Sequence, residues 1–230
     1  METNERYERN IGALTEAEQA LLKSKKAVIV GCGGLGGYIA EFLCRIGLGS
    51  LTVIDGDVFA ASNLNRQLNA LEANLGKGKA AETKKRLLQI RADLSVEAVS
   101  TFLNEDNAND LLKGHDVILD ALDSVKARLL VEKAANDLGI PLVHGAVKEW
   151  NAQVSTVYPG DFTLAMLYPA NEEFERPSVL SFTPAFCAAI QASEAVKVLL
   201  GKGDVLRKKL LTVDLRNNSF ELIALKGTGD

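Results

Sequence analysis

A glycine-rich turn is the part of this sequence best suited to holding a charged ligand. It lies between an apolar run at 27–30, typical of a buried parallel strand, and residues 38–46, whose apolar side chains recur at helical spacing. Glycine lets the backbone turn tightly and lets a phosphate approach, and the start of a helix offers unpaired N–H groups to that anion. The expected contacts come from Gly31, Gly33, Gly34 and Gly36.

Asp55 adds an acidic group at the spacing that a nucleotide site requires. It follows a second apolar run, 50–54, and comes 19 residues after Gly36 (55 − 36). At this distance a carboxylate meets a ribose hydroxyl in folds that carry such a turn. A glycine motif alone is a weak signal, but the order strand, turn, helix, strand and acid predicts a nucleotide site.

Polar side chains then gather at Asn63, Asn65, Arg66 and Gln67. Such a cluster is either a hydrogen-bonded loop or a clamp on a polyphosphate, because a guanidinium presents a planar fork of donors. Lys79 follows in the first turn of a helix expected over 79–90, where the helix dipole disfavours a cation unless an anion is bound beside it. An ordinary solvated lysine is the alternative.

Acidic side chains also follow a third apolar run at 116–121. A carboxylate just past the carboxyl end of a parallel strand faces the ligand crevice of an open sheet. Asp120 lies inside the apolar end, whereas Asp123 lies outside it and is the better metal ligand, because a hard cation needs an accessible oxygen. The alternative role for Asp123 is to cap the helix expected over 125–138.

The alternation of short apolar runs with helical patterns predicts an α/β fold, a Rossmann-like and mostly parallel central sheet with helices on both faces. Later runs at 153–158, 209–215 and 219–226 predict antiparallel strands that extend this sheet, the last two as a hairpin. His144 lies near a strand end with no nucleophile beside it, so a packed or hydrogen-bonded role is expected.

No repeat or linker divides the chain, so residues 1–230 are expected to form one domain. A capping box at Thr15 and Glu18 predicts the first helix, and an apolar helix is expected from Pro184 to Leu200. The expected parts are a helical segment at 1–25, a nucleotide-binding part at 26–147, and a part at 148–230 with a crossover loop over about 160–183.

The composition is that of an ordinary globular protein, with 47% hydrophobic and 24% charged residues and a net charge of −4. This charge gives no electrostatic reason to expect nucleic acid or an anionic membrane as partner. No apolar run approaches the roughly 20 residues that a membrane helix needs. The cysteines, Cys32, Cys44 and Cys187, are scattered and odd in number, which indicates reduced thiols and a cytoplasmic protein.

Taken together, these motifs resemble the ThiF/MoeB/HesA family, the bacterial relatives of ubiquitin-activating enzymes. Their order covers nearly the whole chain and is far more specific than any single motif. The resemblance is carried by Arg6-Tyr-Glu-Arg9, Gly31-Cys-Gly-Gly-Leu-Gly36, Asp55-Gly-Asp57, Ser62-Asn-Leu-Asn-Arg-Gln67, Gly78-Lys79, Asp120-Ala-Leu-Asp123 and the helix at 184–201.

The resemblance implies an adenylyltransferase that uses ATP to activate the C-terminal Gly-Gly carboxylate of a small ubiquitin-like sulfur-carrier protein of ThiS/MoaD type, releasing pyrophosphate. It implies that residues 148–230 serve carrier binding and dimer formation, and that Arg9 acts in trans across a homodimer. It also implies that Asp123 binds Mg²⁺ and that Gln67 supports the Arg66 loop. The implied catalytic set is Arg9, Arg66, Lys79 and Asp123, and the implied ATP-binding set is Gly31, Gly33, Gly34, Gly36, Asp55, Asp57, Ser62, Asn63, Arg66, Gln67, Lys79, Asp123 and Ser124.

Two features depart from the family pattern. Many relatives carry two Cys-x-x-Cys pairs for structural zinc; this chain has neither, so no zinc is expected. The loop at 165–183 has no cysteine and Cys187 falls on the following helix, so an adenylation-only member is expected.

Two other functions remain open at this point. The glycines and Asp55 alone permit an NAD-binding oxidoreductase, although Arg66, Lys79 and Asp123 argue against one, because hydride transfer needs no Mg²⁺ clamp and no convincing proton-transfer residue is found. A related activating enzyme acting on another acyl or tRNA-linked carboxylate is the second, and the acidic pI of about 5.4 weighs against tRNA.

Overall fold

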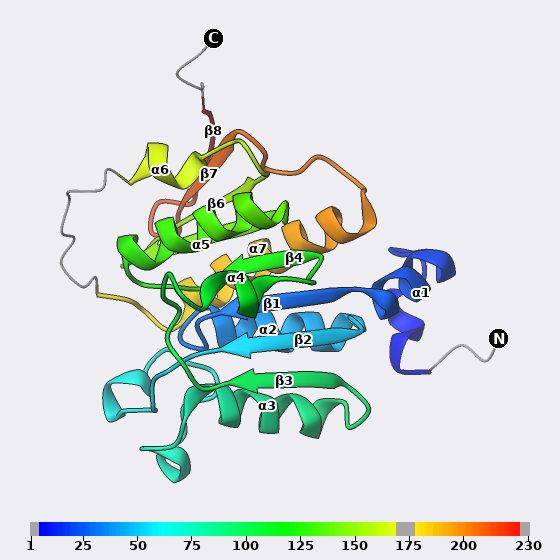
Figure 1. Ribbon diagram of the computed structural model, residues 1–230, viewed down its shortest axis with the longest axis vertical. Coiled ribbons are helices and arrows are strands. Elements are labelled where there is room, and N and C mark those ends of the chain that lie inside the picture. Colours follow the sequence, from blue (N-terminus) through cyan, green and yellow to red (C-terminus); the bar gives the residue numbers. More distant parts are fainter. Residues whose placement is uncertain (1–4, 169–177, 226–230) are drawn as a thin grey trace.

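The computed structural model describes residues 5–168 and 178–225. Within those ranges eight strands form one sheet in the spatial order β3-β2-β1-β4-β5-β6-β7-β8 (Figure 1). Pairing is parallel from β3 to β5 and antiparallel from β5 to β8, which confirms the predicted Rossmann-like sheet. The strands are β1 Lys26–Val30, β2 Ser50–Ile54, β3 Ser95–Val99, β4 Val117–Asp120, β5 Leu142–Lys148, β6 Asn151–Val157, β7 Lys209–Asp214 and β8 Ser219–Ala224.

Helices cover both faces of the sheet, as predicted (Figure 1). Side chains of α2, α3 and α7 contribute to one hydrophobic core, and side chains of α4, α5 and α6 contribute to the other. The α-helices are α1 Glu16–Ser24, α2 Gly36–Ile46, α3 Lys79–Ile90, α4 Ala108–Leu112, α5 Val125–Leu138, α6 Thr163–Leu167 and α7 Phe182–Leu200, and the short 3₁₀ helices are η1 Glu5–Asn10, η2 Ala61–Asn63 and η3 Glu72–Asn74.

The continuous apolar run of β1 reflects burial on both sides of the sheet. Ala27 and Ile29 belong to the core under α2 and α7, whereas Val28 and Val30 belong to the core under α5. Each such aliphatic side chain contributes about 1.5–3 kcal/mol when it is taken out of water. The two cores therefore hold β1 rigidly at the point where the glycine-rich turn begins.

Local signals in the sequence determine the ends of two helices. The capping box of α1 is present: Thr15 Oγ1 accepts a hydrogen bond from Glu18 N at 3.2 Å, and the Glu18 carboxylate accepts one from Thr15 N at 2.7 Å. At the end of α7, Gly201 takes a left-handed conformation with φ of +60°, which costs glycine little. Both were predicted from the residues alone.

The long loop expected over about 160–183 is wrong in part, because it contains the helix α6. The first N–H groups of this helix are capped by a carboxylate that is remote in sequence. Glu132, on α5, accepts hydrogen bonds from Leu164 N at 2.6 Å and from Ala165 N at 2.9 Å. No local pattern announces a cap of this kind. The part of the expected loop at 169–177 lies outside the described residues.

Two other helix starts differ from the prediction. The apolar helix begins at Phe182 and not at Pro184, which lies in the first turn, where its missing N–H needs no partner. The residues at 104–112 also fit a helix by their pattern, but the helix is limited to α4, because Asn104 Oδ1 accepts hydrogen bonds from the backbone N–H groups of Asp106 and Asn107, each at 3.0 Å. Such an Asx turn competes with helix formation.

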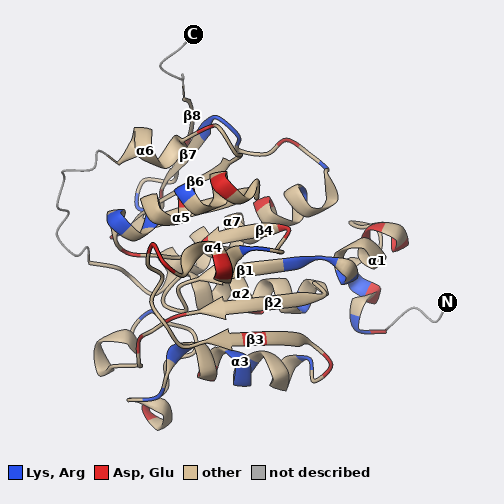
Figure 2. Ribbon diagram, viewed as in Figure 1, with Lys and Arg blue, Asp and Glu red and all other residues tan. Residues whose placement is uncertain are grey.

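Charged side chains of both signs are scattered over the helices and loops (Figure 2). In this view the two signs are mixed among the described residues, which agrees with the small net charge. Among the described residues, no helix is both long enough and apolar enough to cross a membrane.

Candidate active site

A cleft of about 1230 Å³ opens where β1, β2 and β4 end. This edge, at the carboxyl ends of the parallel strands, is where open α/β sheets bind ligands. The antiparallel strands β6 and β7 extend the wall of the cleft away from the glycine turn. Ten of the predicted nucleotide-binding residues line it, namely Gly31, Gly33, Gly34, Asp55, Asp57, Arg66, Gln67, Lys79, Asp123 and Ser124.

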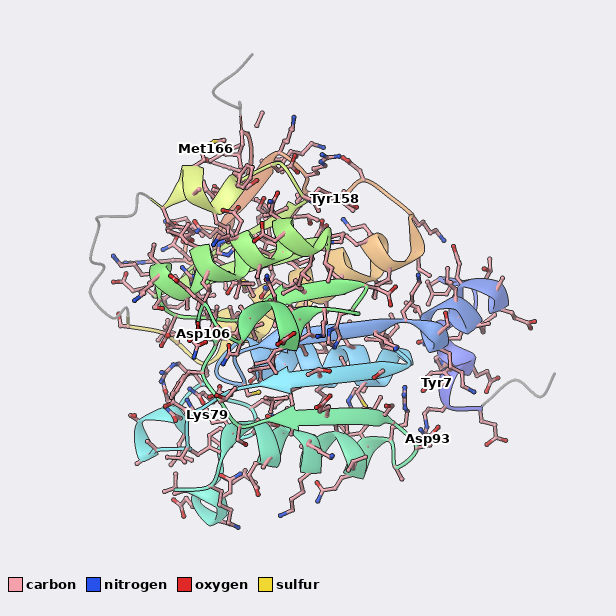
Figure 3. All side chains as sticks on the ribbon, viewed as in Figure 1. Tyr7, Lys79, Asp93, Asp106, Tyr158 and Met166 are labelled. Carbon is pink, nitrogen blue, oxygen red and sulfur yellow. The ribbon has the colours of Figure 1, made fainter. Side chains whose placement is uncertain are left out.

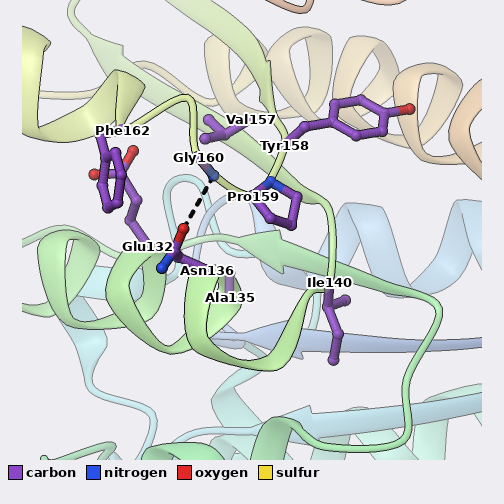
Figure 4. A pocket seen from close by; sticks show the side chains of 9 residues that line it. All are labelled: Glu132, Ala135, Asn136, Ile140, Val157, Tyr158, Pro159, Gly160 and Phe162. Carbon is purple, nitrogen blue, oxygen red and sulfur yellow. Dashed lines mark hydrogen bonds between the residues drawn. The ribbon is translucent and has the colours of Figure 1, made fainter.

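A second hollow, between α5 and the connection from β6 to α6, is far smaller (Figure 4). Its volume is about 10 Å³, which is room for about one water molecule. Asn136 Oδ1 accepts a hydrogen bond from Gly160 N at 3.0 Å across it. This hollow is a packing feature, and the large cleft is the candidate active site.

The glycine turn is shaped by contacts that leave no room for side chains. Gly31 has φ of +99°, and a Cβ there would lie 2.6 Å from the carbonyl oxygen of Ala121. The helix that follows, α2, begins without a side-chain cap and without an acidic residue in its first turn. An uncapped helix start of this kind offers N–H groups to an anion, and Gly34 and Leu35, which directly precede α2, line the cleft.

Asp55 is held by the backbone on both sides of its carboxylate. Oδ2 accepts a hydrogen bond from Cys32 N at 2.7 Å, and Oδ1 accepts one from Asp57 N at 2.8 Å. Burial raises the pKa of Asp55, while these two N–H groups oppose that rise. The side chain is thus fixed at the end of β2, beside the glycine turn, where a ribose hydroxyl can reach it.

Lys79 is buried at the cleft and is not the solvated lysine that was the alternative reading (Figure 3). Its Nζ lies 3.1 Å from Asp57 Oδ2, and its backbone N donates to Asp57 O at 2.9 Å. The side chain of Asp57 remains exposed, with 56% of its surface accessible. The buried ammonium of Lys79, in the first turn of α3, is thereby paired with a carboxylate at the mouth of the cleft. A bound phosphate can contact the same ammonium there.

Arg66 is oriented by its own loop. Its Nη1 donates to Ser62 O at 2.7 Å and to Asn65 Oδ1 at 2.8 Å. Asn65 in turn donates from Nδ2 to Val179 O at 3.1 Å, so the loop is tied to the segment before α7. Gln67 is buried against Gly33, and within the described chain its Oε1 has no hydrogen-bond partner, which leaves an acceptor at the cleft.

Asp123 lies exposed on the loop between β4 and α5, at the cleft. The cap of α5 is Ser124, whose Oγ accepts a hydrogen bond from Ala127 N at 3.3 Å. The helix-capping role considered for Asp123 therefore belongs to its neighbour. An exposed carboxylate in this position suits a hard cation such as Mg²⁺.

Three predicted nucleotide-binding residues do not line the cleft. Gly36 begins α2, where a Cβ would lie 1.8 Å from the carbonyl oxygen of Gly31, so this glycine serves packing of the turn. Asn63 is buried, and its Oδ1 accepts a hydrogen bond from Ala60 N at 3.0 Å. Ser62 is exposed on the same loop and meets Arg66 through its carbonyl oxygen.

Arg9 lies at the other end of the molecule. It belongs to η1, on the side where the parallel strands begin, and Figure 3 shows Tyr7 of the same helix opposite Lys79. Arg9 is exposed there, and it does not line the cleft of its own chain.

Several residues that line the cleft were not predicted as site residues. Phe102 is 64% exposed, and its ring packs on Gly56, where a Cβ would lie 2.6 Å from Cδ2. Arg128 follows Ser124 by four residues, so helical spacing places the two on one side of α5, but spacing alone assigns Arg128 no role. Tyr168 and Gln153 come from later parts of the chain that only the fold brings to the cleft. Among these residues, only Phe102 gave a local signal of a role in the cleft, because it is an aromatic residue just after a strand.

The three cysteines are buried and free, as the sequence indicated. Burial raises the pKa of the Cys187 thiol to about 12, and it also raises the pKa of Cys32. Thiols in this state are poor nucleophiles. The described residues contain no cluster of three or more His, Cys, Asp or Glu side chains suited to a metal.

Comparison with known proteins agrees with this geometry. The ThiF family pattern matches residues 7–228. The chain is 33% identical to the SAMP-activating enzyme E1 of Haloferax volcanii, over 98% of this chain and 87% of that protein. It is 33% identical to the sulfur carrier protein adenylyltransferase of Thermus thermophilus, over 90% and 81%. It is 34% identical to the molybdopterin-synthase adenylyltransferase of Haemophilus influenzae, over 85% and 83%.

Solved structures give the same fold. The structure of Escherichia coli MccB with ATP superposes with a TM-score of 0.85 over 99% of this chain and 73% of that chain. Because the sequence identity is 22%, this likeness concerns the fold. From the family match, the named relatives and the cleft, we conclude that the chain belongs to the ThiF family and is an adenylyltransferase.

Proposed function

We propose that this chain transfers AMP from ATP to the C-terminal Gly-Gly carboxylate of a small ubiquitin-like sulfur-carrier protein. The observation that carries the proposal is the convergence of Arg66, Lys79 and the uncapped start of α2 on one cleft. The names of the three relatives given above support the class of substrate.

The residues present fit a nucleoside triphosphate. The cleft beside the glycine turn has room for phosphate oxygens near the start of α2, and the carboxylate of Asp55 is placed to accept a hydrogen bond from a ribose hydroxyl. The exposed ring of Phe102 offers an apolar face for the base at the same end of the cleft. Arg66 and Lys79 then lie toward the phosphates.

The reaction needs no side-chain base, because the attacking carboxylate is already an anion. One of its oxygens forms a bond to the α-phosphorus, and the bond from that phosphorus to the oxygen bridging toward the β-phosphate breaks. Both electrons of the broken bond leave with pyrophosphate. Negative charge therefore grows on phosphate oxygens, and Arg66 and Lys79 stabilise it from fixed positions.

The oxygen of Asp123 fits a divalent cation as a hard, exposed ligand at the cleft. Mg²⁺ bound there supplies charge neutralisation of the phosphates. No zinc site and no reactive thiol enter this proposal.

The far half of the cleft suits the tail of the carrier. Its walls come from β5, β6 and β7 and include Lys148, Asn151 and Thr212. A Gly-Gly tail is narrow and has many free backbone groups, so polar walls of this kind can bind it in an extended conformation. The family match favours this assignment over a nicotinamide oxidoreductase.

ATP–pyrophosphate exchange tests the proposed function. Exchange of labelled pyrophosphate into ATP is expected to rise strongly when a carrier ending in Gly-Gly is added. The same carrier without its final glycine is the matched control, and it is expected to give only the background rate. Equal exchange with both carriers would contradict the proposal, as would a rise in melting temperature with NAD and none with ATP and Mg²⁺.

We also propose a homodimer in which Arg9 acts on the nucleotide of the partner subunit. Its position at the opposite end of the sheet keeps it from its own cleft, whereas a two-fold axis can bring it to the other. Arg9→Ala and Asp123→Ala proteins are each expected to be inactive. Once subunits are allowed to exchange, mixtures are expected to recover about a quarter of wild-type activity, because half of the dimers then contain one intact site.

Mixing each variant with itself under the same conditions controls for refolding. If Arg9 serves its own chain, the mixed dimers contain no intact site. Mixtures that stay inactive although mass spectrometry shows mixed dimers would rule out the trans role.

A further inference from the structure

A buried carboxylate holds the loop that carries Asp123. Asp120 is fully buried at the end of β4, and its Oδ1 accepts a hydrogen bond from Leu122 N at 2.9 Å. Its Oδ2 lies 2.6 Å from His144 Nδ1 and 3.7 Å from Arg128 Nε. A buried carboxylate persists as an anion only with such partners, so the position of Asp120 depends on all three.

The histidine extends this arrangement to the cleft. Its Nε2 lies 3.0 Å from Tyr168 Oη, and the same hydroxyl oxygen accepts a hydrogen bond from Gln153 Nε2. Because the carboxylate of Asp120 only accepts, the proton of a neutral His144 ring lies on Nδ1, and Nε2 accepts a hydrogen bond from the Tyr168 hydroxyl. Burial lowers the pKa of His144, which agrees with a neutral ring.

Arg128 closes the arrangement from the other side. Its Nη2 donates to Leu122 O at 2.8 Å, directly before Asp123, and its guanidinium lies 5.2 Å from the centre of the Tyr168 ring. Arg128, Tyr168 and Gln153 all line the cleft. The backbone at Leu122 is therefore held at both its N–H and its C=O by members of one hydrogen-bonded group.

We propose that Tyr168 and His144 are positioning residues that couple the far half of the cleft to the Asp123 loop. Gln153, on β6, lies on the wall assigned to the carrier tail, and Tyr168 lines the same cleft. A single chain of hydrogen bonds leads from these two residues to Asp120. The glycine turn, Asp55 and Lys79 are held by other bonds. Loss of the chain therefore affects the use of Mg²⁺ and turnover, but not the affinity for the nucleotide itself. This inference rests on the proposed role of Asp123.

The first test is Tyr168→Phe, which removes only the hydroxyl. Thermal melting with ATP is measured at rising Mg²⁺ concentration and needs no carrier. The Mg²⁺ concentration that gives half of the ATP-dependent stabilisation is expected to rise about tenfold. A change of this size is usual when a residue that orients a metal ligand is lost. In the exchange assay, kcat is expected to fall about tenfold while KM for ATP changes little. His144→Gln is expected to reproduce both effects, and the double variant to add nothing further.

Tyr158→Phe is the matched control. Tyr158 follows β6, stacks with Arg207 at 4.8 Å and does not line the cleft. It is expected to leave the Mg²⁺ midpoint and kcat unchanged. Equal Mg²⁺ midpoints for wild type and Tyr168→Phe would overturn the inference, as would a loss of melting temperature with no change in either midpoint or kcat. Absence of carrier-stimulated exchange in wild type would instead count against the proposed function, since the melting experiment is independent of the carrier.

Discussion

Replacing Arg66 by alanine is expected to lower carrier-dependent ATP–pyrophosphate exchange by about 10²–10³-fold, the usual cost of removing one donor aimed at developing charge. Its guanidinium is held by Ser62 O and Asn65 Oδ1, so it needs no reorganisation when charge grows on the phosphates. Arg66→Lys keeps the charge but loses the planar fork, and an intermediate rate is expected. Initial rates of label exchange at saturating ATP measure both effects.

Arg86→Ala is the control for this prediction. The substitution also removes a hydrogen-bonded guanidinium, but this one lies on the surface of α2 and α3, away from the cleft. Its Nε donates to Glu41 Oε2 at 2.9 Å. Its exchange rate is expected to match that of wild type. If Arg66→Ala retains full exchange, the proposed clamp on the phosphates is wrong.

The substitution Gly36→Ala is expected to destabilise the fold by about 3 kcal/mol or more, because overpacking against a rigid group is costly. A Cβ at this position would lie 1.8 Å from the carbonyl oxygen of Gly31 and 3.3 Å from the Cβ of Ala121. The nearest atom belongs to the backbone of the nucleotide turn, so no rotamer change relieves the contact. Urea unfolding, followed by circular dichroism, measures the loss as a lower midpoint.

Gly37→Ala tests whether the effect is specific to that contact. It lies in the same helix, and its Cβ would lie 3.3 Å from Asn69 Nδ2, a contact that a shift of a few tenths of an ångström relieves. Alanine is also favoured over glycine in a helix by about 1 kcal/mol, which offsets a tight contact. Similar midpoints for the two variants would show that the turn accommodates a side chain at Gly36.

Much of the fold is encoded in short-range patterns. The run at 27–30 reads as a buried strand because both faces of β1 are covered, and α5 spans the predicted residues 125–138. The parts that were missed depend on distant partners. α6 begins where the carboxylate of Glu132 meets its first N–H groups, and neither the spacing nor the composition of 159–168 signals this.

The candidate site also has parts that the sequence could predict and parts that it could not. The glycine turn, Asp55 and Asp123 could be placed because the carboxyl ends of parallel strands meet at one edge of a sheet. Sequence reasoning could not predict the pairing of Lys79 with Asp57 or the hydrogen bonds of Tyr168, because these contacts join residues that only folding brings together. His144 was expected to be packed or hydrogen-bonded, and both are confirmed.

Both flanks of the stretch at 169–177 are attached to the sheet or its loops. Tyr168 precedes it, and on its other side Ser178 O accepts a hydrogen bond from Glu149 N at 2.7 Å, followed by the bond between Val179 O and Asn65. Asn65 joins Val179 O to the guanidinium of Arg66, so any displacement of the segment before α7 also displaces the Arg66 side chain, and the two cannot be remodelled independently.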